Sequence, residues 1–150
     1  MDAVTYLQAS VIEFIQKNMI PLRVKFDTQP LSTDFNIKWT PTTITLDADG
    51  KEHHRTIGFL APEELIPSLV LGIAKSYFDR EQFNKALSTI EKILIDYPES
   101  DSTPEAIYLQ GVCRYKSMHN PKLLKDAYEQ LQAEHPSSEW TKRAYPYRLL

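Results

Sequence analysis

The sequence predicts an α+β segment over residues 1–70, followed by an all-α region of helical repeats over residues 71–150. In the first segment, short alternating apolar stretches lie on both sides of a turn that ends in Gly50, which is typical of a β-hairpin. In the second segment the alternation fades, and apolar residues recur at helical spacing in two related copies. Each element then follows from a local pattern.

Composition narrows the classes of protein to consider. The 150 residues are 42% apolar and 25% charged, as in an ordinary globular chain. The net charge of −3 argues against a nucleic-acid partner, which would require a basic face, and no apolar run is long enough for a membrane helix. The start of the chain lacks a secretory signal. We therefore expect a cytoplasmic protein if Met1 is the true start, and a periplasmic or secreted one if it is not.

The first forty residues predict one helix, one strand and one helical turn. Residues 10–13 have the form of a capping box, and the apolar stripe that follows predicts a helix over residues 9–18. Apolar and polar residues alternate over residues 20–26, which predicts a strand. Residues 31–35 predict a short helical turn.

A β-hairpin and a long helix are predicted next. Residues 42–46 alternate as a half-buried strand, residues 47–50 suit a type I turn with glycine in the left-handed conformation, and residues 51–57 return as the partner strand. A helix over residues 62–78 begins at Pro62, because proline fits the first helical position and the acidic residues that follow favour that end.

Two stretches of this half resemble the thioredoxin family. The sequence WTPTTITLDADGKEHHRTIGFLAPEEL, residues 39–65, is similar to segments in which a cis-proline is followed by threonine, a hairpin and a glycine before the last helix. The stretches MDAVTY and VIEFIQKNMIPLRVKFD resemble family members whose Cys-x-x-Cys motif lies just upstream. The resemblance covers residues 1–70 and implies a truncated thioredoxin-like α/β domain.

The resemblance also implies a docking site for an extended peptide. It places Pro41 at the cis-proline position, Thr40 as the residue whose backbone pairs with the peptide, and Gly58 as a structural glycine in the last strand. Trp39 either covers this site or packs under the sheet. The peptide-binding residues predicted in this way are Trp39, Thr40 and Pro41.

The reactive half of the family's site is missing from the sequence. Thioredoxin chemistry needs a thiolate nucleophile and a resolving cysteine, whereas this chain has only Cys113. We therefore predict no catalytic residue, no metal ligand and no cofactor. Without the preceding strands, residues 22–26 must pair directly with residues 42–46, or a second chain must fill the gap, which suggests a homodimer.

The second half carries two related helix pairs. The first copy is marked by small, aromatic and apolar residues and a closing proline: Ala74, Tyr77, Phe83, Ala86, Ile90, Ile93 and Pro98. Related residues recur 38 positions later (77 to 115) at Tyr115, Tyr128, Leu131 and Pro136. This spacing resembles tetratricopeptide repeats of ~34 residues, with the surplus expected around residues 117–121 and Leu124 in the place of Ala86. Residues 140–147 predict a partial third unit.

Other reactive side chains favour structural interpretations. Cys113 lies in a predicted helix and is expected to be buried and inert. His53 and His54 are expected to be solvated strand residues, because adjacent strand side chains point to opposite faces and cannot share a metal ion. Asp47 and Asp49 imitate the start of a calcium loop, but the distal ligands are missing, which favours a turn.

The sequence as a whole predicts a non-catalytic interaction module with a protein or peptide partner. Lys75, Arg114 and Lys116 either line a concave peptide-binding face or belong to a solvated face. One alternative is a fragment of a thiol–disulfide oxidoreductase whose Cys-x-x-Cys motif lies upstream of Met1. Another is a structural dimer without a peptide partner.

Overall fold

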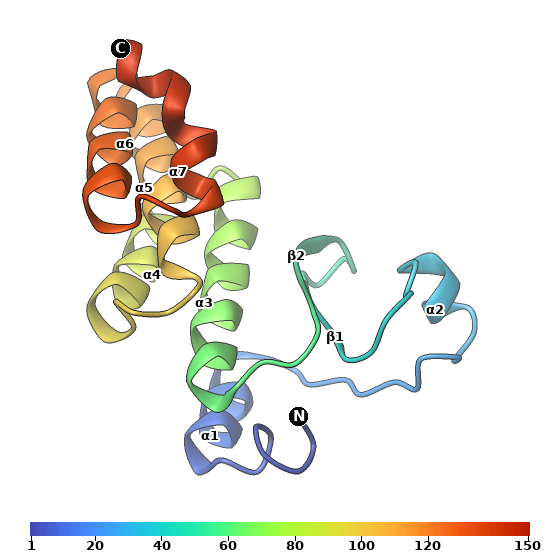
Figure 1. Ribbon diagram of the computed structural model, residues 1–150. Coiled ribbons are helices and arrows are strands. Elements are labelled where there is room, and N and C mark those ends of the chain that lie inside the picture. Colours follow the sequence, from blue (N-terminus) through green and yellow to red (C-terminus); the bar gives the residue numbers. More distant parts are fainter.

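The computed structural model describes residues 1–150 and shows a helix-rich chain with one small sheet, followed by a helical repeat region. In Figure 1 the central helix α3 has the hairpin on one side and the later helices stacked on the other. The elements are α1 (Ala9–Asn18), α2 (Leu31–Asp34), β1 (Thr42–Leu46), β2 (Glu52–Ile57), α3 (Pro62–Asp79), α4 (Phe83–Asp96), α5 (Thr103–Met118), α6 (Lys122–Glu134), α7 (Glu139–Ala144) and the 3-10 helix η1 (Tyr145–Leu149).

Helix α1 has the predicted bounds but lacks the predicted capping box. Its N-cap residue is Gln8, whose carbonyl accepts a hydrogen bond from the Ile12 amide at 3.0 Å, and no side chain caps this end. Because the helix begins before Ser10, the serine is already a helical residue and its hydroxyl cannot cap the helix.

The predicted strand over residues 20–26 is wrong. The sheet contains β1 and β2 alone, and residues 20–24 make no backbone hydrogen bonds. Ile20 and Leu22 are 97% and 79% exposed. A strand requires a neighbour for its N–H and C=O groups. The expected direct pairing with β1 is absent, so this segment is extended without a partner.

The hairpin forms as predicted, including its turn. β1 and β2 pair antiparallel, with Thr42 opposite Ile57 and a bulge at the Thr45–Leu46 step. Gly50 has a φ of 79°, and its amide donates to the Asp47 carbonyl at 3.1 Å. Oδ1 of Asp47 accepts from the amides of Asp49 and Lys51, so this carboxylate stabilises the turn.

The hairpin packs directly on α3 at a glycine. A Cβ atom at position 72 would lie 2.9 Å from Cβ of Thr45 and still closer to the threonine hydroxyl. Thr45 is buried, and its hydroxyl has no hydrogen-bond partner. Gly72 therefore sets how closely the sheet approaches the helix.

One hydrophobic core connects the N-terminal helix with the first repeats. It draws residues from α1, α3, α4 and α5, including Val11, Leu65, Leu71, Ile90, Ile93 and Ala106. A smaller cluster of Ile107, Leu131 and Ala144 joins α5, α6 and α7. The helical repeats thus share their core with the N-terminal part of the chain.

The second helix pair departs from the predicted alignment in two ways. Helix α5 continues through Met118, so the surplus expected over residues 117–121 does not form a longer loop; the connection at 119–121 matches that at 80–82 in length. The close contact between α5 and α6 joins Gly111 to Ala127, because a Cβ atom at 111 would overlap that of Ala127. The small residue expected at Leu124 is therefore supplied by Ala127.

Candidate functional site

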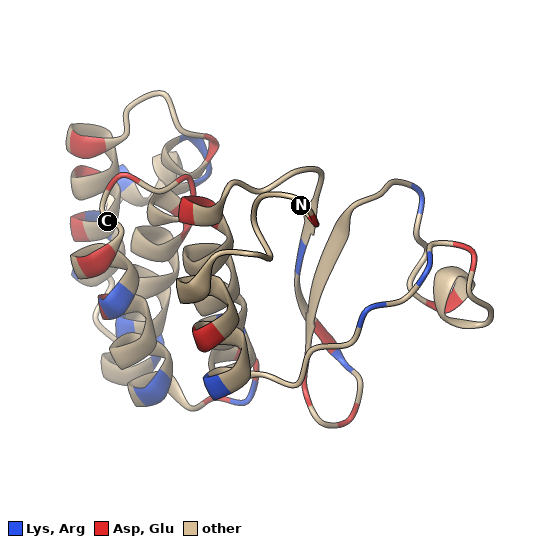
Figure 2. Ribbon diagram, turned by 90° about the horizontal axis from the view of Figure 1, so that it is seen from below, with Lys and Arg blue, Asp and Glu red and all other residues tan.

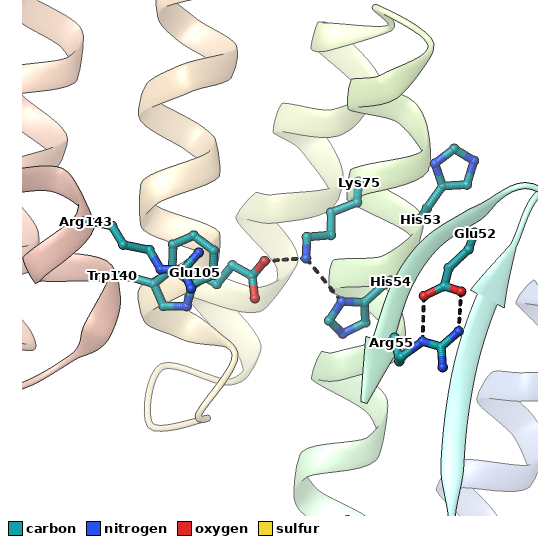
Figure 3. A pocket seen from close by; sticks show the side chains of 8 residues that line it. All are labelled: Glu52, His53, His54, Arg55, Lys75, Glu105, Trp140 and Arg143. Carbon is teal, nitrogen blue, oxygen red and sulfur yellow. Dashed lines mark hydrogen bonds and ion pairs between the residues drawn. The ribbon is translucent and has the colours of Figure 1, made fainter. Parts of the chain in front are cut away.

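A polar pocket of about 430 Å³ opens between β2 and the first helices of the repeats, α3, α5 and α7. Figure 3 shows Lys75 between Glu105 and His54, with Trp140 and Arg143 on one side of this group and the Glu52–Arg55 pair beside β2 on the other. They are Glu52, His53, His54, Arg55, Lys75, Glu105, Trp140 and Arg143.

Lys75 links three of the four walls. Its ammonium group pairs with Oε1 of Glu105 on α5 and lies 3.2 Å from Nδ1 of His54 on β2 (Figure 3). The side chains of Lys75 and Glu105 are only 27% and 14% exposed, so the ion pair is largely shielded from water. Together the ion pair and the contact with His54 join α3 to α5 and to the hairpin.

His54 extends the same network into the interface between the hairpin and α3. Burial, and then the charge of Lys75, lower the pKa of His54 to about 4. Nδ1 of the neutral ring accepts from Lys75, so Nε2 carries the hydrogen and donates to Oγ of Ser68 at 3.2 Å. The Ser68 hydroxyl shares a further hydrogen bond with Thr56 at 3.0 Å.

This arrangement predicts a defined pH dependence of stability. The unfolded chain protonates His54 near its ordinary pKa of 6.5, whereas the folded chain does so only near 4. The contribution of neutral His54 to the free energy of unfolding is therefore fully present above pH 6.5. It is lost as the pH falls from 6.5 to 4, and below pH 4 this group causes no further change. We expect this loss to reach about 2 kcal/mol, measured by urea unfolding across the pH range.

The variant His54→Gln isolates this effect. Glutamine can accept from Lys75 and donate to Ser68, but it does not titrate. The difference in unfolding free energy between the two proteins should vary with pH only between 4 and 6.5. A constant difference over that range would contradict the buried, neutral His54.

His53 also contacts α3, beside the bulge in the hairpin, and joins the hairpin to the end of that helix. Its side chain is fully buried, with Nε2 at 2.9 Å from Oδ2 of Asp47 and Nδ1 at 2.6 Å from Oδ2 of Asp79. The hydrogen bond from His53, and then that from the Lys51 amide, lower the pKa of Asp47.

Arg55 and Glu52 form a rigid pair on β2. The guanidinium group donates to both carboxylate oxygens of Glu52, at 2.8 and 2.6 Å, and to the Phe35 carbonyl at 2.8 Å. The hydrogen bond between the two side chains lowers the pKa of Glu52 and raises that of Arg55. Neither charge is left without a partner.

Helix α7 supplies the aromatic wall. Trp140 packs against Tyr108 with ring centroids 5.2 Å apart, and the guanidinium carbon of Arg143 lies 4.6 Å from the centre of the Trp140 ring. The Tyr108 hydroxyl shares a 2.8 Å hydrogen bond with that of Tyr147. These contacts fix the aromatic wall relative to α5.

A second, more apolar pocket of about 200 Å³ adjoins the first. The two pockets share His53, Lys75, Glu105 and Trp140, and the second adds Phe78, Asp79, Tyr108 and Leu109. We call the two together the groove, the first pocket being its outer compartment and the second its inner compartment. Figure 2 shows that basic and acidic residues both occur along the repeat helices.

The residues predicted from the thioredoxin resemblance lie outside the groove. They cluster at the open end of the hairpin, where the Gly58 amide donates to the Pro41 carbonyl at 2.8 Å and the Thr40–Pro41 peptide bond is cis. Trp39 is 73% exposed, so of the two alternatives for it, packing under the sheet is excluded. The docking role of Trp39, Thr40 and Pro41 remains a prediction.

Other expectations have mixed outcomes. Lys75 lines the groove, whereas Arg114 and Lys116 are exposed and lie outside it. The solvated interpretation of the two histidines is wrong, because His53 is fully buried between carboxylates and His54 is half-buried against α3. Cys113 is buried as expected, and burial raises the pKa of its thiol to about 12.

Several groove residues were missed by sequence reasoning. Glu105, Trp140 and Arg143 stand at different turns of α5 and α7, and no shared spacing marks them as one site. If the first helix of each pair had been placed on one concave face, the sequence would have indicated which helices line the groove, but not which residues. The helical turns that face the hairpin are set by the way the hairpin packs against Gly72 of α3, and no sequence motif predicts this packing.

The comparisons with known proteins agree with the helical geometry. Residues 69–100 and 105–138 match the family model described as "Tetratricopeptide repeat". Residues 69–138 are tetratricopeptide-like repeats. No curated protein and no solved structure matches the chain.

The tetratricopeptide match supports a protein-interaction module with protein partners. The repeats consist of α3 with α4 and α5 with α6, so the groove lies on the side formed by the first helix of each tetratricopeptide unit. None of the helices is both long and apolar enough to cross a lipid bilayer.

Proposed function

We propose that the chain is a non-catalytic interaction module that binds an extended segment of a partner protein in the groove. The observation that carries this proposal is the composite construction of the groove, which joins tetratricopeptide-like helices to β2 through the Glu105–Lys75–His54 network. A charged outer compartment beside an apolar inner one suits a peptide, whose side chains alternate in character.

The non-catalytic part of the proposal rests on the thiol and on the groove's charges. Cys113 is fully buried and its pKa is raised to about 12, so it supplies no thiolate near neutral pH. In the groove, Lys75 and Arg55 are each held by a carboxylate. Because both cations are already paired, they are positioned to bind a ligand and are not free to take part in a reaction.

A relationship of residues 1–70 to thioredoxin is a separate proposal. It is supported by the order of elements, namely α1, an extended segment, α2, the hairpin and α3. The rival function is that of a thiol–disulfide oxidoreductase whose Cys-x-x-Cys motif precedes Met1. An in-frame motif in the DNA immediately upstream would favour the rival, whereas insulin reduction by the 150-residue chain itself should be undetectable.

A homodimer is a further proposal, supported by the exposed, unpaired segment over residues 20–26 and the single partner of β1. Light scattering at high protein concentration tests it. A mass of one chain would count against the dimer without affecting the groove.

Photo-crosslinking tests the binding site. A photo-reactive amino acid in place of Glu139, which is exposed and lies 3.2 Å from the groove residue Arg143, should capture partner proteins from an extract. The same amino acid in place of Ile95, which is 69% exposed on α4, should capture few of them. Equal capture at both positions would contradict binding in the groove.

A further inference from the structure

The charges and the shape of the groove point to the class of segment that it binds. We infer that this segment carries an apolar side chain, which enters the inner compartment, and a carboxylate one to three residues away, which pairs with Arg143. This inference rests on the proposed function and specifies its ligand.

The inner compartment is suited to one apolar side chain. Its floor and walls include Phe78, Tyr108, Leu109 and Trp140, and its volume is about 200 Å³. That is below the usual range of pockets for whole small molecules. The shape favours a single residue of a longer segment over a free metabolite.

The charges of the outer compartment leave one cation available. Glu52 is fully engaged with Arg55, and Glu105 with Lys75, in pairs whose side chains are at most one third exposed. Arg143 has only Glu139, 3.2 Å away, which does not line the compartment. Both members of that pair are more than half exposed, at 57% and 65%.

These differences decide the sign of the ligand's charge. A ligand carboxylate that binds Arg143 replaces only the exposed ion pair between Arg143 and Glu139, which contributes little free energy. A ligand cation would have to displace Arg55 from Glu52 or Lys75 from Glu105, and so break a shielded pair. The groove therefore discriminates in favour of an acidic residue.

The position of Arg143 sets the spacing. Its guanidinium group lies over Trp140, and Trp140 lines both compartments. A carboxylate at Arg143 is thus adjacent to a side chain in the inner compartment. An extended segment advances ~3.3 Å per residue, so neighbouring or nearly neighbouring residues reach the two positions.

Selection from a random decapeptide display library on the intact chain tests this inference. Wild-type protein should enrich an apolar residue with Asp or Glu one to three positions away. Arg143→Glu should retain the apolar preference and replace the acidic preference by Lys or Arg. The matched control Lys142→Glu makes the same charge change on the adjacent, exposed residue of α7, outside both compartments, and should select the wild-type pattern.

A selected peptide, labelled with fluorescein, then gives the affinity by anisotropy. We expect Arg143→Glu to weaken binding at least tenfold and Lys142→Glu less than twofold, with unchanged circular dichroism for both. Peptides that crosslink to the groove without an acidic preference, or equal effects of the two variants, would overturn this inference and leave the proposed function standing. If the wild type enriches no peptide and the photo-reactive variant captures no partner protein, both this inference and the proposed function are contradicted.

Discussion

Replacement of His53 by leucine should lower the free energy of unfolding by about 3 kcal/mol. The side chain is fully buried between the carboxylates of Asp47 and Asp79, and leucine removes both ring nitrogens while leaving both buried carboxylates in place. Urea unfolding followed by circular dichroism measures the loss. Because His53 joins the hairpin to α3, the same variant should increase hydrogen exchange in β2 more than in α6.

Two matched substitutions at helix C-termini distinguish the His53–Asp79 contact from the effect of removing a negative charge at a helix end. Asp79 and Asp96 are the last residues of α3 and α4, but only Asp79 receives a hydrogen bond from His53. Asp79→Asn should destabilise the protein by at least 1 kcal/mol. Asp96→Asn removes a negative charge from a helix C-terminus and should be neutral or slightly stabilising. Equal effects would contradict the role assigned to His53.

Gly72→Ala should lower the free energy of unfolding by about 2–3 kcal/mol. Alanine is the better helix former by about 1 kcal/mol, so packing alone must cause the loss. The new Cβ atom would lie 2.9 Å from Cβ of Thr45, which is fixed on β1. The hairpin would have to move away from α3, which would also alter the groove wall formed by β2.

The double variant Gly72→Ala/Thr45→Ala tests this explanation. Thr45→Ala removes a buried hydroxyl that has no partner, so by itself it should cost little. It also makes room for the alanine at 72, and we expect a favourable coupling of about 1 kcal/mol between the two substitutions. Strict additivity would show that the hairpin and α3 do not meet at this position.

Local patterns were sufficient for most elements of the fold. The turn after Leu46 and the proline at the start of α3 each act within a few residues, and the structure has the hairpin and α3 where these patterns predict them. The strand over residues 20–26 failed because a strand also depends on a neighbour. Its alternation specifies a face, whereas its pairing depends on chain segments elsewhere.

The groove was less accessible to sequence reasoning because it depends on packing between elements. Lys75, Arg114 and Lys116 were assigned either to a concave face or to a solvated one, and of the three only Lys75 lines the groove. The histidines were misjudged: a regular strand would separate their faces, whereas beside the bulge of the hairpin both contact α3, His53 at Asp79 and His54 at Ser68. Such contacts depend on where β2 rests on α3.

The two tryptophans provide the most direct test of the groove as the binding site. Trp140 lines the groove, whereas the exposed Trp39 marks the site implied by the thioredoxin resemblance. We propose ¹⁹F NMR of the chain labelled with 5-fluorotryptophan, assigned with Trp39→Phe and titrated with a selected peptide. Binding in the groove predicts that the Trp140 resonance shifts and the Trp39 resonance does not. A shift of Trp39 with an unmoved Trp140 would contradict the groove and favour the hairpin end around Pro41.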